Sequence, residues 1–527
     1  MPAEDVVHQV FTSADFLLKR KQEKVQAIRS AAPAFRGIFL EGLRARDVKS
    51  LTYAAIDGTE SVDSRLDFMI FYAGAFGYIG ALKAGNDELL MEEERSFSGP
   101  TEISMAVPVH EGDVTDILQA SEEDVSIFPS LLMELSELQL ARQIMSIAAP
   151  KLLLLDRSIS LEYAHLLKDS LELLGKGGTA LFPEILAFWG TTTLPCIVPP
   201  PFISPQLDWA LLESLGTKRW SSWKELSEQL GLSGMQDLVK EAAFALNDQT
   251  ISRLGIPLLR DEFSLDGRFV GLEGQLESAL SSVLEHLFSS REGHPLWVNG
   301  KWIRESELRM ISFLTLRSLI GMALRSRSLI VGITKVSSST DFMTGVLPSM
   351  ERSGRLSRGS EGLGFGTDTT FLDAVAGALE LKAPWRSVEF DAAYHGESVA
   401  PGIFARGYFK LSSSSLGRVF PYDRLLMSPP PHGSWVEGDG SWSGDGLSDS
   451  LFTMLQAMGH EAIPEAIGYN YPLFLADKKA KAAQVEARRA YQAAMGLKLA
   501  GLGLQSEEGY RDMRRYYERL RRSKGVV

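Results

Sequence analysis

The sequence predicts an α/β fold with a mixed, partly parallel sheet, and three neighbouring segments carry that prediction. Residues 51–56 form a short apolar run typical of a buried strand, and residues 151–155 form a second one. Between them, residues 130–149 repeat apolar side chains with the period of a helix, which ends at Pro150. A helix leading directly into a strand favours a sheet in which some neighbouring strands are parallel.

The first 110 residues are predicted to supply one helix and several strands. Residues 14–31 place apolar side chains on one side and Lys and Arg on the other, the pattern of an amphipathic helix. The first strand is expected to end at Asp57, and residues 102–109 alternate like a further strand. Residues 68–82 are the most apolar stretch, but they are short for a membrane span and contain three glycines. We therefore expect buried strands joined by a tight turn there, and no membrane segment.

Residues 160–325 are expected to be mainly helical. Ser222 and Glu225 have the spacing of a capping box that opens a helix reaching Leu230. A turn at residues 231–233 leads into a second helix, and this order fits either a DNA-reading helix-turn-helix or a plain helical pair. Asn299 and Gly300 lie between two short apolar segments and predict a β-hairpin.

Strand patterns return in the last third of the chain, at residues 328–334 and 404–411, whereas the Gly-rich residues 362–366 and 432–448 are predicted to be loops. At 527 residues, the chain is long enough for two or three structural units. The predicted division is an N-terminal helical segment, the first part of a core, a helical insertion, the second part of the core and basic C-terminal helices (residues 1–40, 41–160, 161–325, 326–480 and 481–527).

The charge and cysteine content limit the possible classes of protein. A net charge of −13 argues against a protein that coats nucleic acid nonspecifically. Residues 478–524 are the exception, with 13 basic against five acidic residues, and fit either a phosphate-binding arm or a solvated helical face. The single cysteine, Cys196, fits a reducing compartment, and the acidic N-terminus has no apolar signal core. A cytoplasmic location is therefore predicted.

Carboxylates are the main candidates for chemistry. Asp57 and Asp156 each follow an apolar run, where a charge is tolerated when it is paired or holds a metal ion. If both lie at one edge of a sheet, they suit metal-dependent phosphoryl chemistry. The alternative is that both simply begin turns after strands, as Asp commonly does.

Three further residues are candidates with equally plain alternatives. Glu137 could project toward the same sheet edge, or it could be a surface acid of its helix. Asp477 could be a metal ligand or a helix N-cap. Lys335 follows a strand and could hold a phosphate, or it could be a solvated lysine.

Motifs of several other enzyme classes are missing from the sequence. There are only eight histidines and no HExxH pair, which disfavours a zinc hydrolase. The GxSxG elbow of an α/β-hydrolase and the GxxxxGK[ST] loop of an ATPase do not occur.

Taken together, six short segments resemble the NurA nuclease family in order and approximate spacing, from about residue 40 to residue 485. They are AIDGTES (55–61), LSELQLA (135–141), LLLLDRS (152–158), VGITKVSSS (331–339), ARGYFKL (405–411) and GYNYPLFLADKKA (468–480). Two positions depart from the family pattern. Thr59 replaces the usual serine, and Arg157 stands where the second motif normally has glycine.

The resemblance implies an RNase H-like mixed sheet core with a largely helical insertion and a basic C-terminal helix. It implies a carboxylate site served by manganese or magnesium, in which Asp57, Glu137, Asp156 and Asp477 match the family's metal ligands and Lys335 its lysine. It also implies a homodimer that acts on DNA with a HerA-type hexameric ATPase, in resecting DNA ends for repair. Arg157 keeps open a second possibility, a catalytically weak adaptor that binds DNA and the translocase ring.

Overall fold

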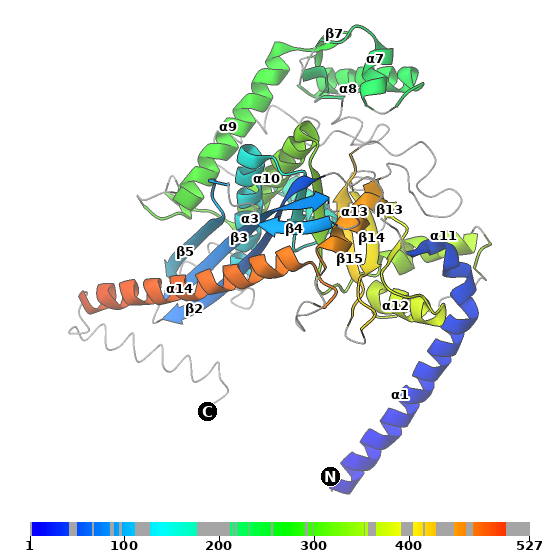
Figure 1. Cartoon of the computed structure of the whole chain (residues 1–527). Coiled ribbons are helices and arrows are strands. Elements are labelled where there is room, and N and C mark those ends of the chain that lie inside the picture. Colours follow the sequence, from blue (N-terminus) through cyan, green and yellow to red (C-terminus); the bar gives the residue numbers. More distant parts are fainter. Residues whose placement is uncertain are drawn as a thin grey trace. The chain divides into compact units, whose positions relative to one another are not determined.

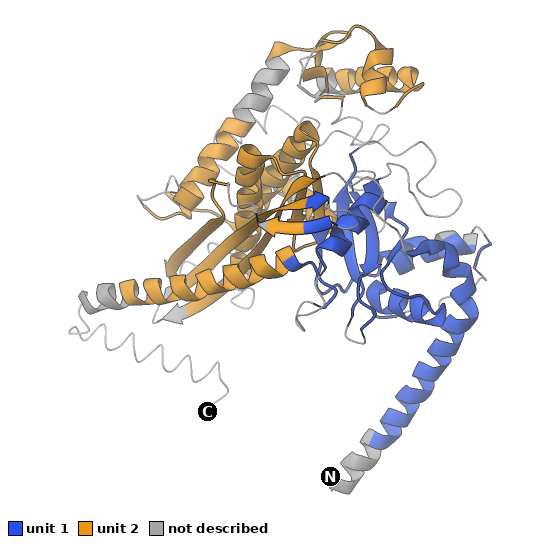
Figure 2. Ribbon diagram, in the orientation of Figure 1, with its two compact units in different colours: residues 1–49, 83–90, 332–471 blue, residues 50–82, 91–331, 472–527 orange. Residues whose placement is uncertain are grey.

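In the computed structural model, the chain is a mixed α/β protein that divides into two compact units (Figure 2). Unit 1 comprises Met1–Lys49, Lys83–Leu90 and Gly332–Tyr471, and unit 2 comprises Ser50–Leu82, Met91–Val331 and Pro472–Val527. The structure describes residues 3–501 apart from residues 42–49, 66–67, 85–88, 94–96, 111–126, 176–210, 213, 217–218, 231, 255–256, 290–292, 299, 353, 357–364, 392–403, 415–416, 428–446 and 460–466.

A mixed sheet forms the centre of unit 2. β3 (Phe68–Ala84) pairs in antiparallel fashion with both β2 (Leu51–Arg65) and β5 (Glu102–His110). On its other side, β2 pairs in parallel with β6 (Leu152–Leu155), from Tyr53↔Leu152 to Ile56↔Leu155. These strands therefore run in the order β5-β3-β2-β6, in which β2 and β6 are parallel.

Two long helices cover opposite faces of this sheet. α3 (Ile127–Ala148) packs on the face to which Gly77 points, because a Cβ atom at Gly77 would lie 2.7 Å from Ile144 Cδ1. α14 (Tyr471–Gly501) lies along β2 and β3 (Figure 1), where Thr59 donates to Gln484 Oε1 at 3.2 Å. Because successive strand residues alternate between faces, Ile56 and Gly58 face α3, whereas Asp57 and Thr59 face α14.

Two predictions for the first strands were wrong. β2 does not end at Asp57 but continues to Arg65, and residues 68–82 lie in one strand, β3, instead of two joined by a turn. The cause is the long antiparallel register, which runs from Leu51↔Leu82 to Arg65↔Phe68. What ends at Asp57 is the parallel pairing with the much shorter β6.

The other helices of unit 2 follow the predicted pattern. α10 (Glu305–Ser326) packs on α3 and on α4 (Ile159–Gly175), and α9 (Gly267–Ser289) packs on α10. Ser222 caps α7 (Trp223–Gln229) by accepting from Glu225 N–H, and α8 (Gln236–Leu254) follows, so both predicted helices are present. Two pairs of short strands also lie in this region: β7 (Leu259–Asp261) with β8 (Ser264–Leu265), and the predicted hairpin of β9 (Trp297–Val298) with β10 (Lys301–Trp302).

Unit 1 is built on antiparallel strands in the order β1 (Phe39–Glu41), β12 (Trp385–Ser387), β14 (Phe404–Lys410) and β15 (Phe420–Leu425), with β13 (Phe390–Asp391) paired to β14. Its apolar core contains Phe35, Phe342, Phe371 and Tyr408. The helical elements of this unit are α1 (Ala3–Ala31), η1 (Ala32–Ile38), η5 (Phe342–Val346), α11 (Leu347–Arg352), α12 (Asp368–Ala378) and α13 (Leu447–Ala457).

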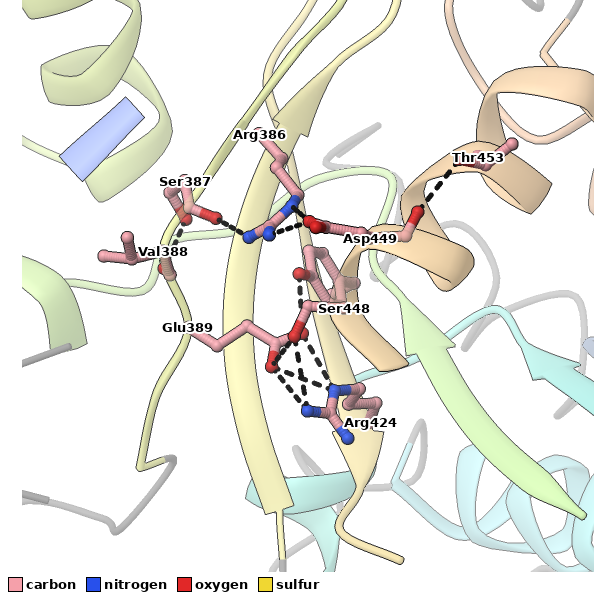
Figure 3. Close-up of polar contacts among 9 residues, drawn as sticks. Arg386, Ser387, Val388, Glu389, Arg424, Ser448, Asp449 and Thr453 are labelled. Atoms are coloured by element: carbon pink, nitrogen blue, oxygen red, sulfur yellow. Dashed lines mark hydrogen bonds and ion pairs between the residues drawn. The ribbon is translucent and has the colours of Figure 1, made fainter. Parts of the chain in front are cut away.

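Buried ion pairs tie the strands of unit 1 to α13 (Figure 3). Arg424 on β15 is fully buried against Glu389, with Nη2 2.7 Å from Oε2. Ser448 in the first turn of α13 donates to the same carboxylate at 2.7 Å. Arg386 on β12 pairs with Asp449 on α13.

Four other predicted strands are present in the structure. The strands at residues 102–109, 151–155, 328–334 and 404–411 are confirmed as β5, β6, β11 (Leu329–Ile333) and β14. None of the described helices is long and apolar enough to cross a membrane. Cys196, most of the loops at residues 362–366 and 432–448, and the basic residues beyond 501 lie outside the described residues.

Candidate functional site

Asp57 and Asp156 lie side by side at the point where β2 and β6 stop pairing. Each is the residue directly after the last parallel pair, Ile56↔Leu155, and Asp156 N–H donates to Ile56 O at 3.3 Å. Asp57 is only 6% exposed and accepts from Gly58 N–H at 2.8 Å through Oδ1. The sheet therefore brings two carboxylate-bearing residues to the same level of two adjacent strands, as predicted.

Helix α14 brings Asp477 close to the same level. Gln484 meets Thr59, and Gln492 donates to Asp63 at 2.8 Å, so the helix advances about 12 Å while β2 advances about 13 Å in the same direction. Seven residues back from Gln484 are two helical turns, or about 10 Å, and Asp57 lies about 7 Å back from Thr59, so Asp477 is on the same helix face and within about 4 Å of the level of Asp57. Its side chain is 13% exposed, and Lys481 Nζ lies 2.7 Å from Oδ1.

A positive charge stands beside this group on the same face of the sheet. Lys479 Nζ lies 4.9 Å from the centre of the Phe76 ring, and Phe76 is the cross-strand partner of Asp57. Lys479 is otherwise exposed. Its ammonium group also lies 5.9 Å from the centre of the Tyr78 ring.

Glu137 belongs to the opposite face of the sheet. A Cβ atom at Gly58 would collide with Glu137 Oε1 and would lie 2.7 Å from Met133 Cγ, both on α3. Glycine at position 58 is therefore required for Glu137 to approach β2 this closely. Because Asp57 is the neighbour of Gly58, its side chain leaves the strand on the other face.

Glu137 is part of a buried group of three acids around Arg157, which we call the Arg157 cluster (Glu134, Glu137, Glu162 and Arg157). Arg157 Nε lies 2.6 Å from Glu137 Oε2, and Nη1 lies 2.5 Å from Glu162 Oε2. Nη1 is also 3.9 Å from Glu134 Oε2. Glu137 is 2% and Arg157 8% exposed. Glu134 Oε1 is buried and has no hydrogen-bond partner among the described residues.

The pKa values of this cluster reflect an excess of negative charge. Burial, together with the charge of Glu162, raises the pKa of Glu134 to about 8. Burial raises the pKa of Glu137 to about 7 against the opposing effect of Arg157. Burial alone would lower the pKa of Arg157, but the carboxylates of Glu137, Glu162 and Glu134 raise it well above its ordinary value. Arg157 is thus charged at any working pH, while Glu134 and Glu137 hold their protons to a higher pH than ordinary glutamates do.

The structure separates the five predicted site residues into three groups. Asp57 and Asp156 adjoin, Asp477 is close to the level of Asp57, and Glu137 is paired with Arg157 on the α3 side. Lys335 lies in unit 1, where its Nζ is 5.3 Å from the centre of the Tyr469 ring.

The expected convergence of Asp57, Glu137 and Asp156 on shared metal ions is not found. Among the described residues, no group of three or more His, Cys, Asp or Glu side chains is arranged to hold a metal ion. The physical reason is that Glu137 turns to Arg157. Asp57 and Asp156 together still fit one hard divalent cation, since magnesium-type ions often take one or two carboxylates and complete their shell with water and phosphate.

Two members of the Arg157 cluster were not predicted from the sequence. Glu134 lies one turn before Glu137 on α3, so their shared helix face was a signal that could have indicated it. Glu162 lies in the first turn of α4, where an acid is also expected simply for its favourable interaction with the helix dipole. Its contact with Arg157 depends on the tertiary structure, because β6 and the following turn place Arg157 between α3 and α4.

Comparisons with known proteins give similarity at the level of structure. No family model matches the chain, and no curated protein does. The NurA nuclease from Sulfolobus solfataricus is matched at 14% identity over 95% of this chain and 96% of that one, with a TM-score of 0.39. NurA with manganese gives 13% identity, coverage of 92% and 98% and a TM-score of 0.37. NurA bound to dAMP and manganese gives 12% identity over 90% of this chain and 93% of that one, with a TM-score of 0.34.

These three solved structures are of NurA proteins. They belong to the family that the sequence motifs resemble. At 12–14% identity and TM-scores below 0.5, the chemistry of this chain has to be inferred from its own residues.

Proposed function

We propose that this chain is a metal-dependent DNA nuclease with an RNase H-like core. The observation that carries the proposal is the adjoining position of Asp57 and Asp156 on parallel strands. The strand order β5-β3-β2-β6, with α3 between β5 and β6 in sequence, supports an RNase H-like arrangement. Carboxylates are the ligands that hard divalent cations prefer.

In this proposal Asp57 and Asp156 hold one manganese or magnesium ion, and Asp477 approaches it from α14. When bound, such an ion polarises a phosphodiester and makes water a better nucleophile at neutral pH. The chain's own residues do the positioning. Sheet register fixes Asp57 against Asp156, and the bonds of Gln484 to Thr59 Oγ1 and Glu60 O fix the course of α14 over them.

Lys479 is the residue best placed to bind the substrate's backbone. Its ammonium group lies over the ring of Phe76, opposite Asp57 on the neighbouring strand. A phosphate held at Asp57 would be attracted to it electrostatically, which orients the backbone and offsets its charge. For Lys335 we propose an additional phosphate contact, on the sequence resemblance alone.

The resemblance also supports the remaining parts of the proposal. The enzyme would work as a homodimer in the cytoplasm, on DNA ends that are resected for repair, with a HerA-type hexameric ATPase as its partner. That partner would supply the DNA affinity that a chain with a net charge of −13 lacks.

The test is cleavage of end-labelled single- and double-stranded DNA with manganese by the wild type, Asp57→Asn and Asp63→Asn. Asp63 lies on the same strand and face as Asp57, and it is paired with Gln492 and Arg488, so it is a matched control. We expect Asp57→Asn to lose at least about 100-fold in rate, the scale for removing a group that stabilises the transition state directly. Asp63→Asn should cut normally. Equal cleavage by wild type and Asp57→Asn would contradict the proposal.

A second candidate function is a catalytically weak adaptor for the translocase ring. The observation that favours it is the ion pair of Glu137 with Arg157, which removes one expected metal ligand. No cleavage under any divalent ion, with and without the ATPase and ATP, combined with tight binding to the ring, would decide for the adaptor.

A further inference from the structure

We propose that Arg157 is a built-in cation that takes the place of a second metal ion. The Arg157 cluster is then closed to divalent ions, and the chain binds one ion, at Asp57 and Asp156, instead of two. The part concerning Asp57 rests on the proposed function, whereas the part concerning the cluster does not.

The guanidinium group of Arg157 occupies the space among the carboxylates of the cluster. Three carboxylates from two helices surround one guanidinium group: Glu134 and Glu137 from α3, and Glu162 from α4. Nitrogens of Arg157 lie 2.6 Å from Glu137 and 2.5 Å from Glu162. These carboxylate oxygens point at the guanidinium, so the space in which an ion would bind them at about 2.1 Å is filled by a side chain.

The cluster has three carboxyl groups for one guanidinium group. A structural ion pair needs one carboxylate for each guanidinium, and this cluster has three. Glu134 Oε1 remains buried without a hydrogen-bond partner among the described residues. Burying three carboxyl groups around one arginine is costly, and removing the guanidinium would leave their oxygens as ligands for another cation.

The Arg157 cluster and Asp57 lie on opposite faces of β2. Glu137 is held against the Cα atom of Gly58 on the α3 face, and Asp57 projects from the other face. One ion cannot therefore take both carboxylates without a rearrangement of α3.

The proposal is tested by the number of Mn²⁺ ions bound per chain, measured on the full chain by isothermal titration calorimetry and by the electron paramagnetic resonance of free Mn²⁺. We compare the wild type with Arg157→Gly and with Arg157→Gly combined with Glu137→Gln. Removing the guanidinium leaves three carboxylates around an open space. We expect one additional ion in Arg157→Gly and its loss in the double variant. An unchanged number of ions in Arg157→Gly would overturn the proposal.

Glu137→Gln alone provides a test that does not require the arginine to be removed, should Arg157→Gly fail to fold. It keeps the volume of the side chain, and circular dichroism checks its fold. If Glu137 is no ligand in the wild type, the affinity for Mn²⁺ should change less than about threefold, whereas Asp57→Asn should lose more than about tenfold, the scale of a lost ligand or ligand support. An equal loss in both variants would overturn the proposal.

The outcomes also separate this inference from the proposed function. If the wild type binds no Mn²⁺ but Arg157→Gly binds one ion, Arg157 is the built-in cation and the site at Asp57 fails. If the wild type binds one ion that Asp57→Asn loses, and Arg157→Gly still binds one, the site at Asp57 stands and the role of Arg157 is refuted.

Discussion

Each unit buries an arginine against a glutamate, but the two pairs differ in charge balance. In unit 1, Glu389 accepts from Arg424 Nε and Nη2 and from the hydroxyl groups of Tyr422 and Ser448, all at 2.7–2.9 Å (Figure 3). One cation meets one anion, and both are fully buried. In unit 2, Arg157 meets three acids, and one of them, Glu134, has an oxygen that no described residue hydrogen-bonds. The Glu389–Arg424 pair is balanced in charge, whereas the Arg157 cluster has more carboxyl groups than its one guanidinium group can pair with.

The largest expected effect on stability comes from breaking the balanced pair. Arg424→Met leaves Glu389 buried without a cation, which should lower the free energy of unfolding by about 3–5 kcal/mol. Arg36→Met is the control, because Arg36 pairs with Glu41 while 57% exposed and should cost less than about 1 kcal/mol. Urea denaturation measures both. Similar small losses would show that the buried pair is not structural.

The next effect concerns catalysis at the sheet edge. Asp156→Asn should lower manganese-dependent DNA cleavage by about 100-fold, because it removes one of two carboxylates from the proposed ion, while the urea midpoint stays close to that of the wild type. Asp169→Asn is the control, since Asp169 pairs with Arg309 away from β2 and β6. An equal fall in cleavage in both variants would show that Asp156 has no specific role in catalysis.

A pH effect should follow from the surplus acid of the Arg157 cluster. Because burial raises the pKa of Glu134 to about 8, the folded state holds its proton more tightly than the unfolded state does. This stabilisation is complete below about pH 4.5 and is lost as the pH rises toward 8. Between pH 5.5 and 7.5 the free energy of unfolding of the wild type should therefore fall by about 1–2 kcal/mol more than that of Glu134→Gln. One titrating group can change it by at most about 1.4 kcal/mol per pH unit. Urea denaturation series at the two pH values give the comparison, and parallel losses would contradict it.

The smallest expected effect comes from α14. Gln484→Ala removes the bonds to Thr59 Oγ1 and Glu60 O and should cost about 1 kcal/mol of stability, with a few-fold loss of cleavage as Asp477 and Lys479 become less well placed. Gln492→Ala loses one bond to Asp63 farther along the helix and should cut like the wild type. Identical cleavage by both variants would show that α14 does not position the site.

Much of this arrangement could be predicted from the sequence, because its signals are local. The helix of residues 130–149, the strand after it and the hairpin at Asn299–Gly300 follow from periodicity and turn chemistry. The continuation of β2 past Asp57 could not, because it depends on pairing with β3 along the whole hairpin. The position of Glu137 could not either, because the sequence does not show that the glycine after Asp57 opens the face of β2 to α3.

The proposed difference between the Asp57–Asp156 pair, which binds an ion, and the Arg157 cluster, which does not, is tested most directly by anomalous diffraction at the manganese edge, on crystals of the full chain grown with Mn²⁺. We predict one anomalous peak per chain, within bonding distance of the Asp57 and Asp156 carboxylates, and none between Glu134, Glu137 and Glu162. A peak inside the Arg157 cluster with the guanidinium displaced, or no peak at Asp57, would contradict the account.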